Sequence, residues 1–256
     1  MVKKSIKKTA NKIETVSYFK LSKTAFYGFT STLPLLIVYE VMAFYLTKSL
    51  LNANRSVAEY WLVGLFSLLG TIGFVVLGLL GLALIIYFFR DKIVNKIPVI
   101  KSFYFLMLVE SIVYSFFFGA VVIRILKFPM SSNLLQAGGL PHNKWQSIML
   151  SLGAGYFEEL LFRVILYGAP LFLILWLIRQ GKKKKETKTA RITVIILIGL
   201  ISAVLFSFAH HLAGEPFELY AFWYRTISGI LFVVLYQLRG FGVAAYTHAF
   251  YDLWIV

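Results

Sequence analysis

The sequence contains no cysteine, and this absence removes several classes of chemistry at once. Disulfide bonds, thiolate metal sites and a cysteine nucleophile are all excluded. The first 24 residues are rich in lysine but lack an apolar segment followed by a small-residue cleavage site. We therefore do not expect a removable signal peptide at this end of the sequence.

Charged residues are also scarce, because they make up 14% of the 256 residues while 59% are hydrophobic. The apolar residues form six or seven long runs, and the ten-residue alternation of membrane β-strands is not seen. A helix needs roughly 20 residues to cross the hydrocarbon core. The sequence therefore predicts an all-α, polytopic transmembrane helix bundle of seven to eight spans.

The boundaries of the expected spans are taken from the hydropathy of these apolar runs alone. Two of them are longer than a bilayer requires, so we expect each to tilt, kink or extend beyond the membrane. In the fourth span, over 146–178, Gly168 and Pro170 predict a break, because proline removes a helix hydrogen bond. Residues 171–178 would then form an eighth short helix. The expected spans are 26–47, 62–89, 103–126, 146–178, 192–211, 217–238 and 242–256.

The net charge of +15 does not indicate nucleic-acid binding, because the basic residues lie mostly between the apolar runs. On this topology 19 basic residues fall on one side of the membrane and 4 on the other. We expect a multi-pass protein of the cell membrane, and the positive-inside rule predicts that its N-terminus is cytoplasmic. We expect a basic tail over 1–25 and a single transmembrane domain over 26–256. The run 182–185 is expected to be a solvated loop with affinity for anionic lipid.

Several ionisable residues lie inside the expected spans, where they are costly and usually carry function. Glu40 and Glu110 stand alone in sequence, so polar contacts between helices explain them best. Arg124 lies near a span end and is expected to reach the interface. The full set is Glu40, Glu110, Arg124, Glu158, Glu159, Arg163, His210, Arg225, His248 and Asp252.

The stretch 153–163 places two adjacent carboxylates, Glu158 and Glu159, in one span. Glu159 and Arg163 are four residues apart and can pair on one helical face. Glu158 points about 100° away and stays free for chemistry. A buried carboxylate of this kind can take a proton from water. Small residues before it allow close approach of a helix or a substrate.

Two further motifs are Phe206-x-x-x-His210 and His248-x-x-x-Asp252. Taken alone, His210 is explained by an interfacial position, and the His248–Asp252 pair equally well by a polar contact between helices. An aspartate can also fix a histidine tautomer and orient its other nitrogen. Together the three motifs supply a base, orienting groups and oxyanion donors, which indicates hydrolysis by activated water, with or without a metal.

These motifs resemble the CAAX protease and bacteriocin-processing (Abi) family of intramembrane endopeptidases, over about residues 146–256. The family pattern is Glu-Glu-x-x-x-Arg, Phe-x-x-x-His and His-x-x-x-Asn/Asp, and Arg225 and Gly229 also look like the family. The resemblance implies the following roles: Glu158 and His210 activate water; His248 and Asp252 bind the oxyanion; Glu159, Arg163 and Phe206 support them.

The resemblance favours a glutamate-dependent reaction without a cofactor. If zinc were bound, Glu158, His210 and His248 would supply three ligands. Asp252 departs from the asparagine that is frequent in the family, and an ionised aspartate cannot donate a hydrogen bond to an oxyanion. It is then either protonated or serves only to orient His248.

The expected spans put Glu158 near mid-bilayer and His210 near the outer surface, so the two residues would lie at different depths. The resemblance predicts that these groups meet, so a span boundary is expected to be wrong. The expected substrate is a peptide, prepeptide or membrane protein, such as a leader peptide or bacteriocin.

Two other functions remain open from the sequence. One is a non-catalytic interaction protein, such as a bacteriocin-immunity factor or the membrane partner of a sensor kinase. A sensor kinase or a peptide exporter is also a possible partner of the protein. The other is a transporter in which Glu158 and Asp252 carry protons, although paired broken helices are not seen in the sequence.

Overall fold

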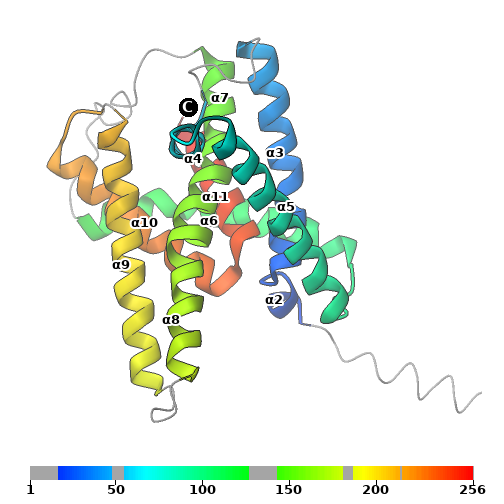
Figure 1. The fold of residues 1–256 in the computed structure, drawn as a ribbon. Coiled ribbons are helices and arrows are strands. Elements are labelled where there is room, and N and C mark those ends of the chain that lie inside the picture. The colour runs from blue at the N-terminus through cyan, green and yellow to red at the C-terminus, as the bar shows by residue number, and fades with distance from the viewer. Residues whose placement is uncertain (1–16, 48–54, 127–142, 181–186, 214, 256) are drawn as a thin grey trace, which may run out of the picture.

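The computed structural model describes residues 17–47, 55–126, 143–180, 187–213 and 215–255, and every regular element among them is a helix (Figure 1). This confirms the all-α prediction. Part of the basic tail predicted for 1–25 and the lysine run 182–185 lie outside the described residues. The helices are α2 (Tyr18–Leu21), α3 (Ala25–Thr47), α4 (Val57–Ser67), α5 (Gly70–Val94), α6 (Lys101–Leu126), α7 (Lys144–Gly153), the π-helix η2 (Ala154–Gly168), α8 (Ala169–Gln180), α9 (Lys188–Leu212), α10 (Leu219–Arg239) and α11 (Phe241–Ile255).

Six of the described helices are long and apolar enough to cross a membrane, by length and composition. They are α3, α5, α6, the continuous rod α7–η2–α8, α9 and α10. The last predicted span corresponds to α11, which has 15 residues. The count therefore agrees roughly with the expected seven to eight spans, and the protein is a multi-pass membrane protein.

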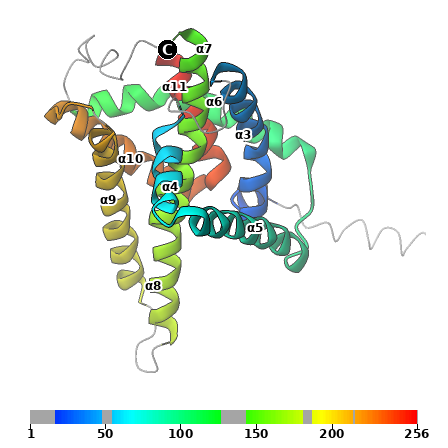
Figure 2. The same cartoon turned by 45° about the horizontal axis from the view of Figure 1, so that its top comes forward.

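The span predicted over 62–89 is wrong as a single helix, because the chain turns between α4 and α5. Gly70 begins α5 with a φ of 58°, in the left-handed region that glycine enters at little cost. The turn lets α5 leave the direction of α4. Figure 2 shows α5 lying across the bundle, oblique to the α8–α9 hairpin.

The break predicted at Gly168 and Pro170 is also wrong, because Lys144–Gln180 forms one uninterrupted rod. The backbone is π-helical up to Gly168 and α-helical from Ala169 onward. Pro170 is the second residue of the α-helical segment, so the hydrogen bond that it lacks falls at the junction between the two helical registers. Residues 171–178 therefore continue the same rod as part of α8.

Helix α11 occupies the interior of the bundle and packs against α3, α6, α7, η2 and α10. The nine consecutive residues from Phe241 to Ala249 are all buried, so neighbours surround this part of the helix. Small residues make the contacts close: a Cβ added at Gly155 of η2 would lie 2.7 Å from the carbonyl oxygen of Ala245. The sequence of α11 is therefore matched to a position inside the protein.

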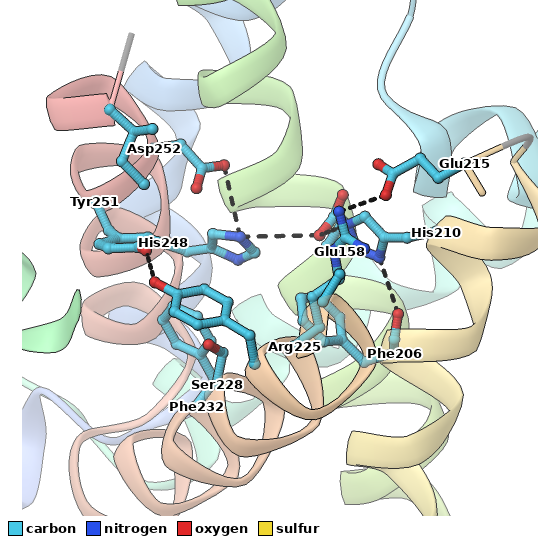
Figure 3. A pocket seen from close by; sticks show the side chains of 13 residues that line it. Glu158, Phe206, His210, Glu215, Arg225, Ser228, Phe232, His248, Tyr251 and Asp252 are labelled. Carbon is cyan, nitrogen blue, oxygen red and sulfur yellow. Dashed lines mark hydrogen bonds and ion pairs between the residues drawn. The ribbon is translucent and has the colours of Figure 1, made fainter. Parts of the chain in front are cut away.

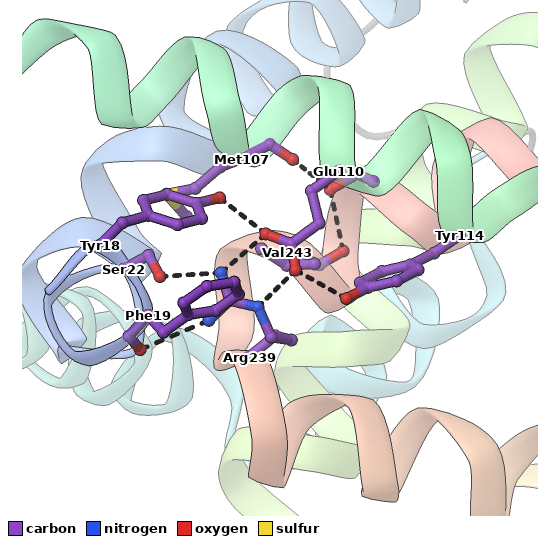
Figure 4. Close-up of polar contacts among 9 residues, drawn as sticks. Tyr18, Phe19, Ser22, Met107, Glu110, Tyr114, Arg239 and Val243 are labelled. Atoms are coloured by element: carbon purple, nitrogen blue, oxygen red, sulfur yellow. Dashed lines mark hydrogen bonds and ion pairs between the residues drawn. The ribbon is translucent and has the colours of Figure 1, made fainter.

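A buried ion pair joins α6 to the end of α10 (Figure 4). Arg239 donates from Nε to Oε1 of Glu110 at 2.5 Å and from Nη2 to Oε2 at 2.7 Å. The Tyr18 hydroxyl donates to the same carboxylate at 2.7 Å and so attaches α2 to the bundle. The interior role predicted for Glu110 is confirmed. Arg239, which lies between the spans predicted over 217–238 and 242–256, is buried.

A second polar cluster lies at the start of α4. Arg55 pairs with Glu40 of α3 at 2.7 Å and also with Glu59, whose carboxylate accepts from the Tyr39 hydroxyl. Glu40 therefore makes a structural contact, as predicted. Arg124 is exposed near the end of α6, consistent with the expected position at an interface.

We predict that Gly229→Ala destabilises the protein, because the new Cβ would lie 2.9 Å from the Cα of Ala203 and separate α9 from α10. Overpacking of this kind costs about 1–3 kcal/mol. Gly78→Ala is the matched control, since a Cβ there has no neighbouring atom within 4 Å among the described residues. Thermal unfolding in detergent micelles measures both variants. Equal unfolding temperatures would show that the two helices are not in close contact.

Candidate functional site

The three sequence motifs meet around one cavity of about 310 Å³ (Figure 3). Helices η2, α9, α10 and α11 and the loop before α10 contribute its walls. This places the predicted residues Glu158, Phe206, His210, His248 and Asp252 together. The complete lining is Glu158, Phe206, His210, Glu215, Ala221, Tyr224, Arg225, Ser228, Phe232, His248, Tyr251, Asp252 and Ile255.

Helix register explains why Glu158 and His210 meet although the drawn spans separated them. The rod that ends with α8 and helix α9 run side by side as an antiparallel hairpin (Figure 1). Glu158 lies 22 residues before Gln180, and His210 lies 22 residues after Lys188. Residues equally far from a hairpin end have similar heights. The conflict came from treating 146–178 as one centred span, whereas the rod is longer than a bilayer is thick.

Glu158 is buried and lies between two imidazole rings. Its Oε2 is 4.0 Å from Nε2 of His210 and 3.8 Å from Nε2 of His248. Both distances exceed that of a direct hydrogen bond but fit groups that share a bridging molecule. The carboxylate and the two histidines therefore define a small polar centre inside an apolar bundle.

The environment of His210 determines which of its nitrogens is available. Nδ1 lies 3.0 Å from the carbonyl oxygen of Phe206 on the same helix. A carbonyl oxygen only accepts, so Nδ1 carries the proton and donates. Nε2 of the neutral ring is then left with a free lone pair on the side of Glu158. His210 is thereby presented as a base.

His248 is held differently, because its Nδ1 lies 2.8 Å from Oε1 of Glu159. Its Nε2 faces both Glu158, at 3.8 Å, and Asp252, at 3.6 Å. Glu159 therefore occupies the orienting position that the sequence offered to Asp252. This contact joins residues 89 positions apart, and local spacing has no signal for it.

Arg163 completes the support beneath the site. It is fully buried, and its Nε lies 3.2 Å from Oε2 of Glu159, as the i, i+4 spacing predicted. The guanidinium carbon lies 4.5 Å from the centre of the Phe206 ring and 5.1 Å from that of Phe232. These aromatic faces stabilise the cation. Phe206 thus links the arginine to both histidine rings, which it contacts edge-on.

The cavity includes polar residues to which the sequence gave no role. Arg225 of α10 forms an ion pair with Glu215, which lies in the loop between α9 and α10. Burial raises the pKa of the Glu215 carboxyl, and the neighbouring Arg225 opposes that shift. The hydroxyls of Tyr224 and Tyr251 form a hydrogen bond across the opposite wall. Charge inside a span marked Arg225 in advance, but Glu215 lay in an unremarkable loop.

The described residues contain no group of three or more histidine, aspartate or glutamate side chains arranged to hold a metal ion. The proposed zinc ligands Glu158, His210 and His248 face one another, but their arrangement does not form such a group.

The fold and the site together define a multi-pass helical membrane protein with an internal carboxylate–histidine centre. Residues 141–254 match the family model described as type II CAAX prenyl endopeptidase, Rce1-like. The match confirms the resemblance seen in the sequence: this part of the chain is similar to the type II CAAX prenyl endopeptidases. A search of the curated proteins and a search of the solved structures each found no match.

We predict that Glu159→Gln lowers stability more than any change at Asp252. Glu159 is fully buried between Arg163 and His248, and removing its charge leaves a buried guanidinium uncompensated. Breaking a buried pair in this way costs about 3–5 kcal/mol. Asp252→Asn is the control, since its side chain is 29% exposed. Thermal unfolding in micelles compares them, and equal losses would contradict the supporting role of Glu159.

Proposed function

We propose that this protein is an intramembrane endopeptidase that hydrolyses a peptide bond with water activated by Glu158 and His210. The observation that carries the proposal is the buried Glu158 carboxylate between two histidine Nε2 atoms, at 4.0 and 3.8 Å, in a cavity of about 310 Å³. A base, an oriented second base and a donor around one empty volume are the parts that hydrolysis requires.

In the proposed reaction a water molecule lies between Glu158 and Nε2 of His210. Glu158 takes a proton as the water oxygen attacks the carbonyl carbon, and the carbonyl π electrons move to its oxygen. The tetrahedral intermediate collapses, the C–N bond breaks, and the proton passes from Glu158 to the leaving amine. His210 accepts a hydrogen bond from the same water and holds it in line.

His248 is proposed to stabilise the oxyanion. With Nδ1 donating to Glu159, a proton on Nε2 makes the ring an imidazolium with a second donor facing the cavity. The Glu159 carboxylate stabilises that cation. Donors aimed at the developing charge are among the largest contributions to catalysis. Asp252 is assigned to this end of the site, either as a protonated donor or by keeping His248 charged.

The reaction as proposed needs no cofactor. Zinc is not part of the proposed reaction, because its three candidate ligands Glu158, His210 and His248 are not arranged as a metal site among the described residues. The proposed substrate is a peptide, prepeptide or membrane-protein segment that reaches the site from the bilayer. We also propose that the protein lies in the cell membrane with its N-terminus in the cytoplasm. A sensor kinase or a peptide exporter is proposed as its partner.

We predict that Glu158→Gln and His210→Ala each lower cleavage by about 10²–10⁴-fold, the usual contribution of a general base. Comparative peptidomics of cells carrying wild-type or Glu158→Gln protein identifies the product peptides. The same peptides are then assayed with purified protein. Glu40→Gln makes the same chemical change outside the cavity and should retain activity. Retained cleavage in both site variants would refute the peptidase, and an unchanged cellular phenotype would favour an immunity or interaction role.

We predict that Asp252→Asn retains cleavage, because the amide can donate to an oxyanion. Asp252→Ala removes both the hydrogen-bonding group and the charge. It should lower kcat by about 10-fold or more, in keeping with the loss of one group that stabilises the oxyanion. Single-turnover rates on the peptides identified above measure both variants. A loss for Asp252→Asn as large as that for Asp252→Ala would show that the negative charge next to His248, and not a hydrogen-bond donor, is what matters.

A further inference from the structure

Arg225 carries a hydrogen-bond donor that the reaction above does not use. Its Nη2 pairs with Glu215, whereas Nη1 is buried and makes no hydrogen bond with the described residues. Buried polar atoms without a partner are rare, and each calls for an explanation. Arg225 lines the catalytic cavity, so the unused donor belongs to a side chain in the wall of the site.

The position of Arg225 relative to the catalytic groups is visible in Figure 3. The side chain extends from α10 toward Glu215, on the side of the cavity occupied by Glu158 and His210. Its side chain is 19% exposed and that of Glu215 is 20% exposed, so the pair is largely shielded from solvent. The guanidinium is therefore a positive group, paired with Glu215, in the wall of the cavity that also holds Glu158 and His210.

Among the cavity-lining residues that the structure describes, Arg225 is the single arginine, and no lysine lines the wall. Arg163, the other arginine nearby, is fully buried beneath the site and does not line it. Guanidinium binds oxygen anions well because it presents several N–H donors in one plane. Glu215 occupies one edge of this fork and leaves Nη1 for another oxygen.

We propose that Arg225 binds an anionic oxygen of the substrate peptide through Nη1, with Glu215 holding the guanidinium in place. The proposal rests on the peptidase function proposed above. Two oxygens share this chemistry: the oxyanion formed at the scissile carbonyl, and the terminal carboxylate of a peptide cut near its end. In the first case Arg225 is a catalytic residue, and in the second it determines specificity.

The first experiment measures equilibrium binding and does not depend on cleavage. N-acetyl-trileucine with a free carboxylate and its C-terminal amide are titrated against Glu158→Gln protein in nanodiscs, with tryptophan fluorescence as the signal. If Arg225 holds a terminal carboxylate, the acid binds about 10-fold more tightly than the amide, as for one charge-assisted hydrogen bond. That difference disappears in Glu158→Gln/Arg225→Gln protein and partly returns with Arg225→Lys.

The second experiment measures kinetics on an amide-terminated peptide identified as a substrate. If Arg225 holds the oxyanion, Arg225→Gln lowers kcat by about 10²-fold and leaves KM nearly unchanged. Arg124→Gln, the same change at the exposed end of α6, is the control and should retain both parameters. Equal acid and amide binding together with an unchanged kcat would overturn the proposal.

Glu215→Gln separates anion binding from a purely structural ion pair. If Arg225 serves the substrate, removing the competing charge of Glu215 leaves binding of the acid unchanged or tighter, while Arg225→Gln weakens it. If the pair only supports the α9–α10 loop, both variants weaken binding and lower the unfolding temperature alike. If the wild-type protein cleaves no peptide but still binds the acid more tightly than the amide, the peptidase proposal fails and the anion site is supported.

Discussion

The site depends on one buried carboxylate, Glu159, which contacts two cations or potential cations from different parts of the chain. It pairs with Arg163 at 3.2 Å and accepts from His248 Nδ1 at 2.8 Å. In a low-dielectric interior each of these charges would be costly alone. Because Glu159 serves both, it fixes the α11 histidine against η2 and leaves the adjacent Glu158 directed into the cavity.

Helix α11 gives that interaction its precision. The helix is buried on all sides from Phe241 to Ala249, and small residues bring η2 into close contact with it. The start of the helix is held by the Arg239–Glu110 pair and, through Tyr18, by α2. The N-terminal helices lie outside the matched residues 141–254, yet α3 and α6 surround the helix that carries His248. They form the frame of the site.

Much of the site could be read from local spacing. Glu159 and Arg163 share a helical turn, and their pairing follows from that alone. The Glu158, His210 and His248 motifs were visible because charge inside a span is costly. The Glu159–His248 contact and the Glu215–Arg225 pair were not, since each depends on how separate helices pack. The π-helical register of Ala154–Gly168 also has no simple sequence signal.

The sequence by itself determined that the chain folds as apolar helices with a few ionisable residues concentrated in three motifs, because hydropathy and helical periodicity are local properties. Tertiary structure alone decided which of those residues meet. The hairpin register brought His210 level with Glu158. The packing of α11 placed Nδ1 of His248 against Glu159, while Asp252 faces Nε2 of the same ring. Height, rotation and pairing are set by contacts between distant segments, and these depend on the whole bundle.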